Sequence, residues 1–421
     1  MNEIIALLFA FLGTSPVATA ATVFIFDIPR DLLSLTGLAL SRGRRKSPQH
    51  GHVPPDRITI VIPVLNDAEG LLVSLQSIHR QTHKPAQIIV VSDGSTDNTN
   101  AVLTTLHQRG EIDRLIINDR RLGRGVSGNV ALHFVDTEFV MFIDCDTLLG
   151  PNALEALQSR LMERPDAGAC SGNIGVNNHR ASLWTALQQL EYMVALDFGR
   201  EFADSFNAMA CCSGALSMYR TEHLIHIGGF SPGSGEDLGT TLRFRRAGYE
   251  VHFEADAWAY TNAPVSLSAL VQQRLRWDRD AFRLQILQYR QWKKQSTKER
   301  LGSTLQRYDY ILFTLLPTLM MPFLLPIIAS VPAAQRPAFI GGGYMFLVGV
   351  AVFTLAPAFI AYRGRTPAFL LLLLPIYPAY QGIMMKAVRL YAYLSEAIGH
   401  ASRGDHYVPA RIRARLDRSG P

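Results

Sequence analysis

Cysteine and charged residues are both scarce in this chain of 421 residues, and each shortage excludes a class of protein. The four cysteines form no CxxC pair and have no clustered histidine partner, which argues against a disulfide scaffold and against structural zinc. Charged residues make up only 18% of the chain against 48% hydrophobic residues, which excludes a disordered chain. The net charge of +6 is small and scattered, so no nucleic-acid partner is predicted.

The hydrophobic residues gather at the two ends of the chain. Residues 4–26 carry no charge and are long enough to cross a bilayer core of roughly 30 Å. Because Glu3 is the only earlier charge, the segment indicates a retained anchor and not a secretory signal. The basic cluster SRGRRK at 41–46 belongs on the cytoplasmic side of a membrane, which predicts a cytoplasmic middle domain.

Three apolar segments follow the middle of the chain. Residues 310–331 and 338–361 are long enough to span a membrane, whereas 367–385 is interrupted by Pro375 and Pro378. A full crossing by the third segment would place the arginine-rich C-terminus outside, against the positive-inside tendency. We therefore expect 367–385 to be re-entrant or interfacial, with a cytoplasmic C-terminus.

The middle of the chain alternates between two kinds of segment. Buried-strand patterns are separated by apolar residues at helical spacing, which predicts an α/β domain with a parallel sheet and helices on both faces. The segments run in the order ITIVIPVL, AEGLLVSLQSIHRQ, QIIVVSDGS, TDNTNAVLTTLHQRG, RLIIND, VSGNVALHFV and FVMFIDCD. Ligands of such sheets bind at the carboxyl ends of the strands. Asp93, Asp144 and Asp146 each follow a strand, so we expect them to face one crevice.

Each of these acidic motifs also has a purely structural interpretation. Asp93 and Gly94 are common turn residues, and Asp144 and Asp146 could belong to a solvated loop. Two carboxylates placed two residues apart after an apolar strand also suit a hard divalent cation that keeps some water and is completed by phosphate oxygens.

Two later segments leave similar alternatives open. Glu236 and Asp237 begin a helix-like segment, where acids either stabilise the helix by about 0.3–1 kcal/mol or supply a general base for an acceptor hydroxyl. The QRLRW segment that ends at Trp277 is either a helix with a cationic face or an arginine fork for a diphosphate beside a flat ring for a sugar.

The motifs PVLND, SDGS, DCD, GED and QRLRW, in this order over residues 57–280, resemble the inverting, membrane-integrated family 2 glycosyltransferases. That group includes the cellulose, chitin, hyaluronan and poly-N-acetylglucosamine synthases. The resemblance implies a GT-A fold, an α/β domain with a mostly parallel sheet, inserted between transmembrane or interfacial helices. It also implies a UDP-sugar donor and Mg²⁺ or Mn²⁺ as cofactor.

The resemblance extends to individual residues. It implies that Asp237 is the catalytic base and that Asp144 and Asp146 hold the metal on the donor diphosphate. The residues implied to bind the donor are Asp93, Arg124, Asp144 and Arg276. The residues implied to bind the acceptor are Ser213, Gly214, Glu236, Gln273 and Trp277.

A finer resemblance bears on the sugar. LEY at 190–192 and CSGALSMYR at 212–220 are similar to segments of the rhizobial chitooligosaccharide synthases and of hyaluronan synthases, which favours N-acetylglucosamine. The chain departs from the family at Arg124, Asp67 and Asp278, where Lys, Glu and a small or apolar residue are usual. Arg for Lys is not neutral at a phosphate-contacting site, so these departures bear on the identity of the donor.

The sequence thus predicts a processive β-glycosyltransferase that elongates a polysaccharide and translocates it across a bacterial inner membrane, in which it is multi-pass with a cytoplasmic catalytic domain. Its expected partners are a UDP-sugar, the growing polysaccharide, the lipid bilayer and accessory secretion subunits. Alternatives are a glucan synthase that uses UDP-glucose and a non-processive transferase with a lipid acceptor. An inactive scaffold is disfavoured because all the expected carboxylates are present, and a dehydrogenase is excluded because no GxGxxG follows the first strand.

The predicted division of the chain has six parts. They are an N-terminal transmembrane helix (1–27), a basic cytoplasmic linker (28–55), a catalytic domain (56–282), interfacial helices (283–309), a C-terminal transmembrane region (310–387) and a basic tail (388–421).

Overall fold

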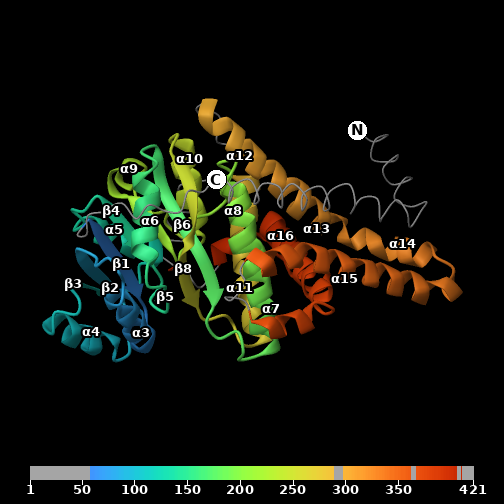
Figure 1. Ribbon diagram of the computed structural model, residues 1–421, viewed down its shortest axis with the longest axis horizontal. Helices are drawn as coiled ribbons and strands as arrows, with labels where there is room; N and C mark the ends of the chain where they lie inside the picture. Colours follow the sequence, from blue (N-terminus) through green and yellow to red (C-terminus); the bar gives the residue numbers. More distant parts are fainter. Residues whose placement is uncertain (1–56, 289–296, 362–366, 405–408, 410–421) are drawn as a thin grey trace. The chain divides into compact units, whose positions relative to one another are not determined.

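The computed structural model describes residues 57–288, 297–361, 367–404 and 409 (Figure 1). The predicted anchor at 4–26 and the basic cluster at 41–46 lie outside these residues. The described residues belong to two compact units. One contains the residues up to Gln306 together with those from Ala392 on, and the other contains Arg307–Tyr391.

The first unit is built on an eight-stranded sheet with the order β3-β2-β1-β4-β7-β6-β8-β5. Its strands are β1 (Ile58–Val64), β2 (Gln87–Asp93), β3 (Arg114–Asn118), β4 (Phe139–Phe142), β5 (Leu148–Leu149), β6 (Ala167–Val176), β7 (Ser217–Arg220) and β8 (Glu250–Thr261). Neighbouring strands pair in parallel except where β7 joins β4 and β6, and where β5 joins β8. The predicted mostly parallel sheet is confirmed.

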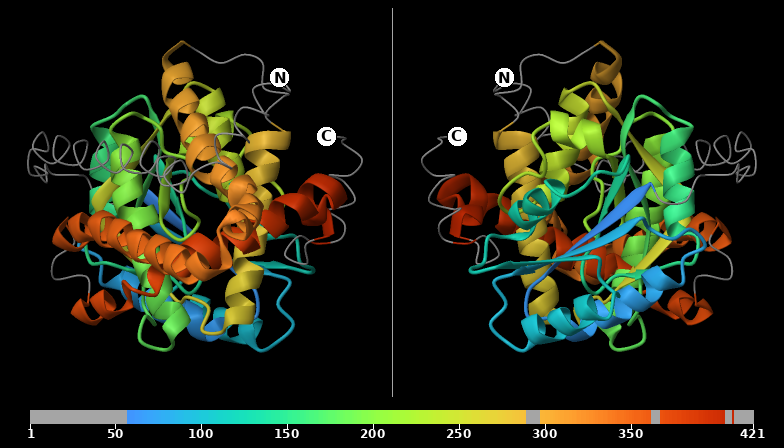
Figure 2. Two further views of the ribbon diagram at one scale, coloured as in Figure 1. Left: turned by 90° about the vertical axis from the view of Figure 1, so that its right-hand side faces the viewer. Right: turned by 90° about the vertical axis from the view of Figure 1, so that its left-hand side faces the viewer.

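Helices cover both faces of this sheet (Figure 2). They are α3 (Ala68–His79), α4 (Thr99–Gln108), α5 (Arg124–Leu132), α6 (Ala153–Met162), α7 (Leu183–Tyr192), α8 (Gly199–Asp204), α9 (Thr221–His226), α10 (Glu236–Arg246) and α11 (Leu267–Phe282), with π-helical turns η1 (Met193–Phe198) and η2 (Arg283–Leu287). The predicted strand–helix alternation from residue 57 to residue 146 is confirmed in β1 to β4 and in α3, α4 and α5.

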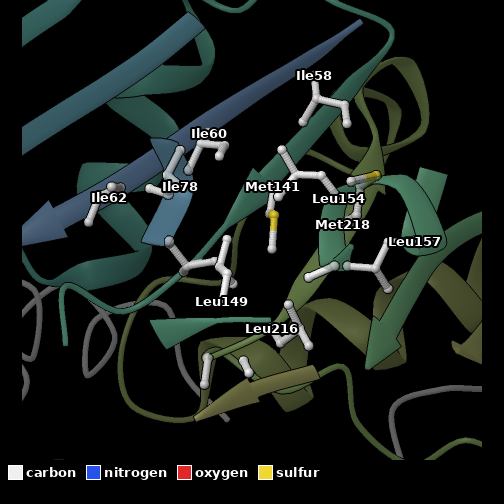
Figure 3. Close-up of a cluster of buried hydrophobic side chains, with 14 of the residues drawn as sticks. Ile58, Ile60, Ile62, Ile78, Met141, Leu149, Leu154, Leu157, Leu216 and Met218 are labelled. Atoms are coloured by element: carbon white, nitrogen blue, oxygen red, sulfur yellow. The ribbon is translucent and has the colours of Figure 1, made fainter. Parts of the chain in front are cut away.

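The strands divide their side chains between two apolar clusters, because successive residues of a strand point to opposite faces. Ile58, Ile60 and Ile62 of β1 pack on one face, where Figure 3 shows them with Ile78 of α3 and side chains of α6. Val61 belongs to the cluster on the other face, which α5, α9 and α10 cover. A strand that is buried on both faces needs a continuous apolar run, which explains the composition of ITIVIPVL.

The second unit consists of helical segments. These are α12 (Thr297–Tyr310, mostly in the first unit), η4 (Ile311–Leu315), α13 (Leu316–Met320), η5 (Met321–Phe323), α14 (Leu324–Ser330), η6 (Ala333–Gln335), α15 (Arg336–Ala361), η7 (Ala368–Leu373), η8 (Ala379–Met385) and the start of α16 (Lys386–Gly399). Among the described residues, Leu301–Ser330 and Ala333–Phe353 are long and apolar enough to cross a membrane. They overlap the first two apolar runs, 310–331 and 338–361, that the sequence predicted after the middle domain.

The end of the described chain packs on α11 of the first unit. The ring of Tyr393 in α16 stacks on Phe282, with centroids 4.9 Å apart, and Arg279 Nε donates to Ser395 Oγ at 3.0 Å. The Glu396 carboxylate is 1% exposed and accepts hydrogen bonds from the amide and hydroxyl of Ser402, just before the last turn η9 (Ala401–Gly404) ends. Part of the predicted basic tail is therefore an ordered support of α11.

A buried histidine joins β8 to α8. His252 Nδ1 lies 2.8 Å from Asp204 Oδ1 and His252 Nε2 lies 3.0 Å from Glu250 Oε2, while Arg160 pairs with the other oxygen of Asp204 at 2.7 Å. Burial alone would lower the pKa of His252, but the hydrogen bonds with Asp204 and Glu250 outweigh it and raise the pKa above 6.5. Burial acts against ionisation of Asp204 too, yet His252 and Arg160 lower its pKa.

These opposite shifts predict how stability depends on pH. The contribution of His252 is complete below its unfolded pKa of 6.5 and is lost as pH rises through its higher folded pKa, whereas that of Asp204 is lost only in acid. We expect the Tm of the full protein to fall as pH is raised from 6.5 to about 9, and to fall less in His252→Gln. Thermal unfolding followed by intrinsic fluorescence measures this; equal slopes in the two proteins would contradict it.

Candidate active site

The carboxylate of Asp93 organises the loop that precedes α5. Asp93 ends β2, is 4% exposed, and accepts hydrogen bonds from the amides of Leu122 at 2.7 Å and Gly123 at 2.8 Å and from Ser127 Oγ at 2.8 Å. Gly94 follows at a φ of 73°, where an added Cβ would lie 2.3 Å from the amide of Arg121. Asp93 therefore fixes residues 120–123 at the carboxyl edge of the sheet.

Arg124, the first residue of α5, connects three of the predicted motifs. Its Nε lies 2.7 Å from Asp144 Oδ1, its Nη1 donates to Glu236 Oε1 at 2.5 Å, and its Nη2 donates to the carbonyl oxygen of Gly214 at 2.7 Å. The guanidinium carbon lies 4.3 Å from the centroid of the Phe142 ring. Burial would lower the pKa of Arg124, but the carboxylates of Asp144 and Glu236 outweigh it and raise the pKa, so the side chain stays a cation.

This arrangement brings Glu236 and Gly214, predicted for the acceptor, into contact with Arg124, which is predicted for the donor and also lies against Asp144. Space beside Gly214 is tight, because an added Cβ would lie 3.0 Å from both terminal nitrogens of Arg124. Ser213 lies in the same turn before β7, where its amide donates to Ser171 Oγ at 3.3 Å.

Asp144 and Asp146 both follow the end of β4 and carry the chemistry of a metal site. Asp144 is 40% exposed, and burial together with repulsion from Asp144 raises the pKa of Asp146 to about 6. Within the described part of the chain, no group of three or more His, Cys, Asp and Glu side chains is arranged for a metal. Two hard carboxylates, one of them accessible, still fit a divalent cation whose other ligands are water and donor phosphates.

Asp237 lies in the first turn of α10. A contact that stabilises the start of the helix and a role as general base are compatible there. Its Oδ1 accepts the amide of Leu238 at 2.7 Å, which is a helix N-terminal contact. Its neighbour is Cys211, and burial and the Asp237 carboxylate raise the pKa of that thiol well above its ordinary value. The thiol therefore stays protonated beside Asp237.

The loop before α10 is tied to α11 by Asp280, which the sequence analysis missed. Ser234 Oγ donates to Asp280 Oδ2, and Arg283 pairs with Asp280 Oδ1 at 2.8 Å. Gly235 lies against the same side chain at a φ of 69°, where an added Cβ would be 2.9 Å from Asp280 Cβ. Burial raises the pKa of Asp280, whereas the charges of Arg283 and Arg276 lower it. Arg276 thus lies one turn from the residue that holds the GED loop.

Gln273 and Trp277, predicted for the acceptor, both contact Arg274 on α11. Arg274 Nη1 donates to Gln273 Oε1 at 2.7 Å, and its guanidinium carbon lies 4.4 Å from the centroid of the Trp277 ring. The structure therefore gathers five of the predicted residues around two arginines: Asp144, Gly214 and Glu236 around Arg124, and Gln273 and Trp277 around Arg274.

All four cysteines are free thiols, and none of them is fully exposed. Burial raises the pKa of each one, to about 11 in Cys212. Cys145, between the two acids of DCD, donates its S–H to Asp67 Oδ2 at 3.3 Å. Asp67 in turn caps α3 by accepting the amide of Gly70 at 2.9 Å.

Residues 54–279 match a protein family described as glycosyltransferase like family 2. The chain is 26% identical over 290 residues to an N-acetylglucosaminyltransferase of Sinorhizobium fredii, covering 66% of this chain and 70% of that protein. It is 30% identical over 256 residues to a hyaluronan synthase of Streptococcus pyogenes, covering 57% of this chain and 60% of the synthase. The chain thus spans little more than half the length of this second relative.

A solved structure has the same fold. It is a mannosyltransferase from Pyrobaculum calidifontis in complex with GDP-Man and Mn²⁺, which superposes with a TM-score of 0.59 at 18% identity over 92% of this chain and 99% of that one. The predicted GT-A fold is confirmed.

Proposed function

Because the chain belongs to glycosyltransferase family 2 and is an inverting hexosyltransferase, we propose that it uses UDP-N-acetylglucosamine to elongate a β-linked polysaccharide processively. The observation that carries the proposal is the contact of Arg124 with Asp144 and Glu236, since it joins the DCD and GED motifs around one buried cation. N-acetylglucosamine is favoured over glucose because the similar proteins include an N-acetylglucosaminyltransferase and a hyaluronan synthase.

In this proposal Asp144 and Asp146 would hold Mg²⁺ or Mn²⁺ when the donor diphosphate is bound. The ion would supply positive charge where the leaving diphosphate gains negative charge. Besides the metal ion, the Arg276 guanidinium supplies positive charge on the acceptor side of the diphosphate. Arg124 holds the carboxylate of Asp144 in position through their ion pair. Asp93 acts on the nucleotide through the loop that it fixes at residues 120–123.

Asp237 is proposed as the general base. It takes the proton of the acceptor hydroxyl while that oxygen attacks the anomeric carbon from the face opposite the diphosphate. One displacement inverts the stereocentre, so an α-linked donor gives a β-linked product. Ser213, Gly214, Glu236, Gln273 and Trp277 border the acceptor in this assignment.

We place the enzyme in a bacterial inner membrane, multi-pass, with residues 56–282 as a cytoplasmic catalytic domain that meets nucleotide-sugars. The two apolar helices Leu301–Ser330 and Ala333–Phe353 support the membrane assignment. The growing polysaccharide then leaves through the membrane region, with accessory secretion subunits as partners.

The test is to incubate the full protein in lipid with each radiolabelled UDP-sugar and Mg²⁺ or Mn²⁺, and to digest the product with linkage-specific hydrolases. We expect UDP-N-acetylglucosamine to give a polymer that a β-hexosaminide-specific hydrolase degrades. If only UDP-glucose gave a polymer, glucose and not N-acetylglucosamine would be the transferred sugar. If one sugar were transferred to a lipid and no polymer formed, the enzyme would not be processive.

Gly94→Ala is expected to weaken UDP binding by about tenfold or more, because the new methyl group pushes the 120–123 loop off Asp93. Gly110→Ala is the matched control, since Gly110 has the same φ of 73° but nothing within 4 Å of an added Cβ. Titration calorimetry with UDP compares the two. Equal UDP affinities in the two variants would mean that the 120–123 loop does not hold the nucleotide.

A further inference from the structure

Arg274 is the residue of QRLRW to which the proposed chemistry gives no task, yet it lies between two acceptor residues. Its side chain is 5% exposed. One of its nitrogens donates to Gln273 Oε1 at 2.7 Å, and its guanidinium carbon stands 4.4 Å from the centroid of the Trp277 ring. A buried guanidinium is costly unless a carboxylate compensates it.

That carboxylate comes from the LEY segment, which the proposed function also leaves without a task. Arg274 Nη2 donates to Glu191 Oε2 at 2.8 Å, and Glu191 is 18% exposed. The ring centroid of Tyr192 lies 5.9 Å from the same guanidinium carbon. Glu191 and Arg274 are 83 residues apart in sequence, and their contact joins α7 to α11, which lie side by side in Figure 1.

The helix that carries Glu191 is itself held by the sheet. Gln189 Oε1 accepts the amide of Val176 at the end of β6, at 2.7 Å. Gln188 Nε2 donates to the carbonyl of Pro264, in the turn that leads into α11, at 3.0 Å. A continuous series of contacts therefore connects the sheet to α7, α7 to the guanidinium of Arg274, and that guanidinium to the indole ring of Trp277.

We propose that Glu191 and Arg274 are positioning residues for the acceptor sugar, which hold the indole of Trp277 and the amide of Gln273 in place. The guanidinium takes one face of the indole by a cation–π contact, so a sugar ring stacks on the other face. Trp277 is 39% exposed, which leaves ring surface for this contact. Lysine cannot replace Arg274, because only the planar fork reaches Glu191 and Gln273 while it lies against the ring. This inference rests on the proposed function.

The experiment compares Glu191→Gln and Arg274→Lys with wild type, as full protein in lipid, using N-acetylchitotetraose as acceptor probe. We expect the acceptor KM to rise about tenfold, with donor hydrolysis in the absence of acceptor changed less than about twofold. Glu222→Gln is the matched control, because Glu222 is 77% exposed and lies on α9. An unchanged acceptor KM, or an equal loss of donor hydrolysis, would overturn the inference.

A second measurement separates this inference from the proposed function. The fluorescence of Trp277 is taken as the difference between each protein and its Trp277→Phe version, since the chain has four tryptophans. We expect acrylamide to quench this signal more strongly in Glu191→Gln than in wild type or Glu222→Gln. If wild type uses none of the UDP-sugars, the proposed function fails, and the quenching still decides whether Glu191 fixes the ring.

Discussion

Asp237→Asn is expected to abolish sugar transfer, with a loss of at least about 10²-fold, while UDP binding changes less than about twofold. The amide has the shape of the carboxylate and can keep the helix N-terminal position of α10, but it cannot accept the proton of the acceptor hydroxyl. Polymer formation from radiolabelled donor measures transfer, and calorimetry measures UDP affinity.

Two further variants make this result specific. Asp166→Asn is the matched control, because Asp166 has an exposed side chain outside the site. Glu236→Gln should instead weaken donor binding, because it removes one of the two carboxylates that hold Arg124. Near wild-type polymerisation by Asp237→Asn would show that Asp237 is not the base.

Asp144→Asn and Asp146→Asn are expected to remove most Mn²⁺ binding and to reduce transfer about 10²-fold or more, and EDTA should stop the wild-type protein in the same way. Asp144→Asn should also release Arg124 Nε, so it should lower the thermal stability more than Asp146→Asn. Electron paramagnetic resonance of Mn²⁺ measures binding without turnover.

The exposed Asp136, which precedes β4, supplies the control Asp136→Asn. Undiminished transfer in EDTA, together with unchanged Mn²⁺ binding in both variants, would make DCD a structural turn. If only Asp146→Asn lost Mn²⁺ binding, Asp144 would not be a metal ligand and its role would be the ion pair with Arg124.

The first half of the sheet could be predicted from sequence because β1, β2 and β4 are continuous apolar runs, and β1, β2 and β3 are each followed by a helical period. The second half could not. β5 has only two residues, and β7 reads Ser-Met-Tyr-Arg, so neither is a continuous apolar run as the equally short β4 is. β6 and β8 pair through a shift between Gly172 and Asn173, and no local pattern indicates such an irregularity.

The residue types of the site followed from motif order, but their partners did not. Arg124 and Glu236 are 112 residues apart, and only the fold shows that a donor and an acceptor motif share one cation. Asp280 was overlooked because an acid on a polar helix face carries no signal until its burial is known, and Arg274 was noticed only as part of QRLRW. Glu191 was noticed as part of LEY, but its ion pair with Arg274 could not be predicted, because only the fold places α11 beside α7.

The protonated state of the native thiols makes the membrane orientation of this chain easier to measure. Maleimides react with thiolates, so Cys145, Cys170, Cys211 and Cys212, whose pKa values are all raised by burial, should label slowly at neutral pH. A single cysteine in place of Ser419 can then be probed from outside intact cells without first removing the native ones, which leaves the Cys211–Asp237 contact undisturbed. Rapid labelling would indicate an external C-terminus, with little background labelling of the native cysteines.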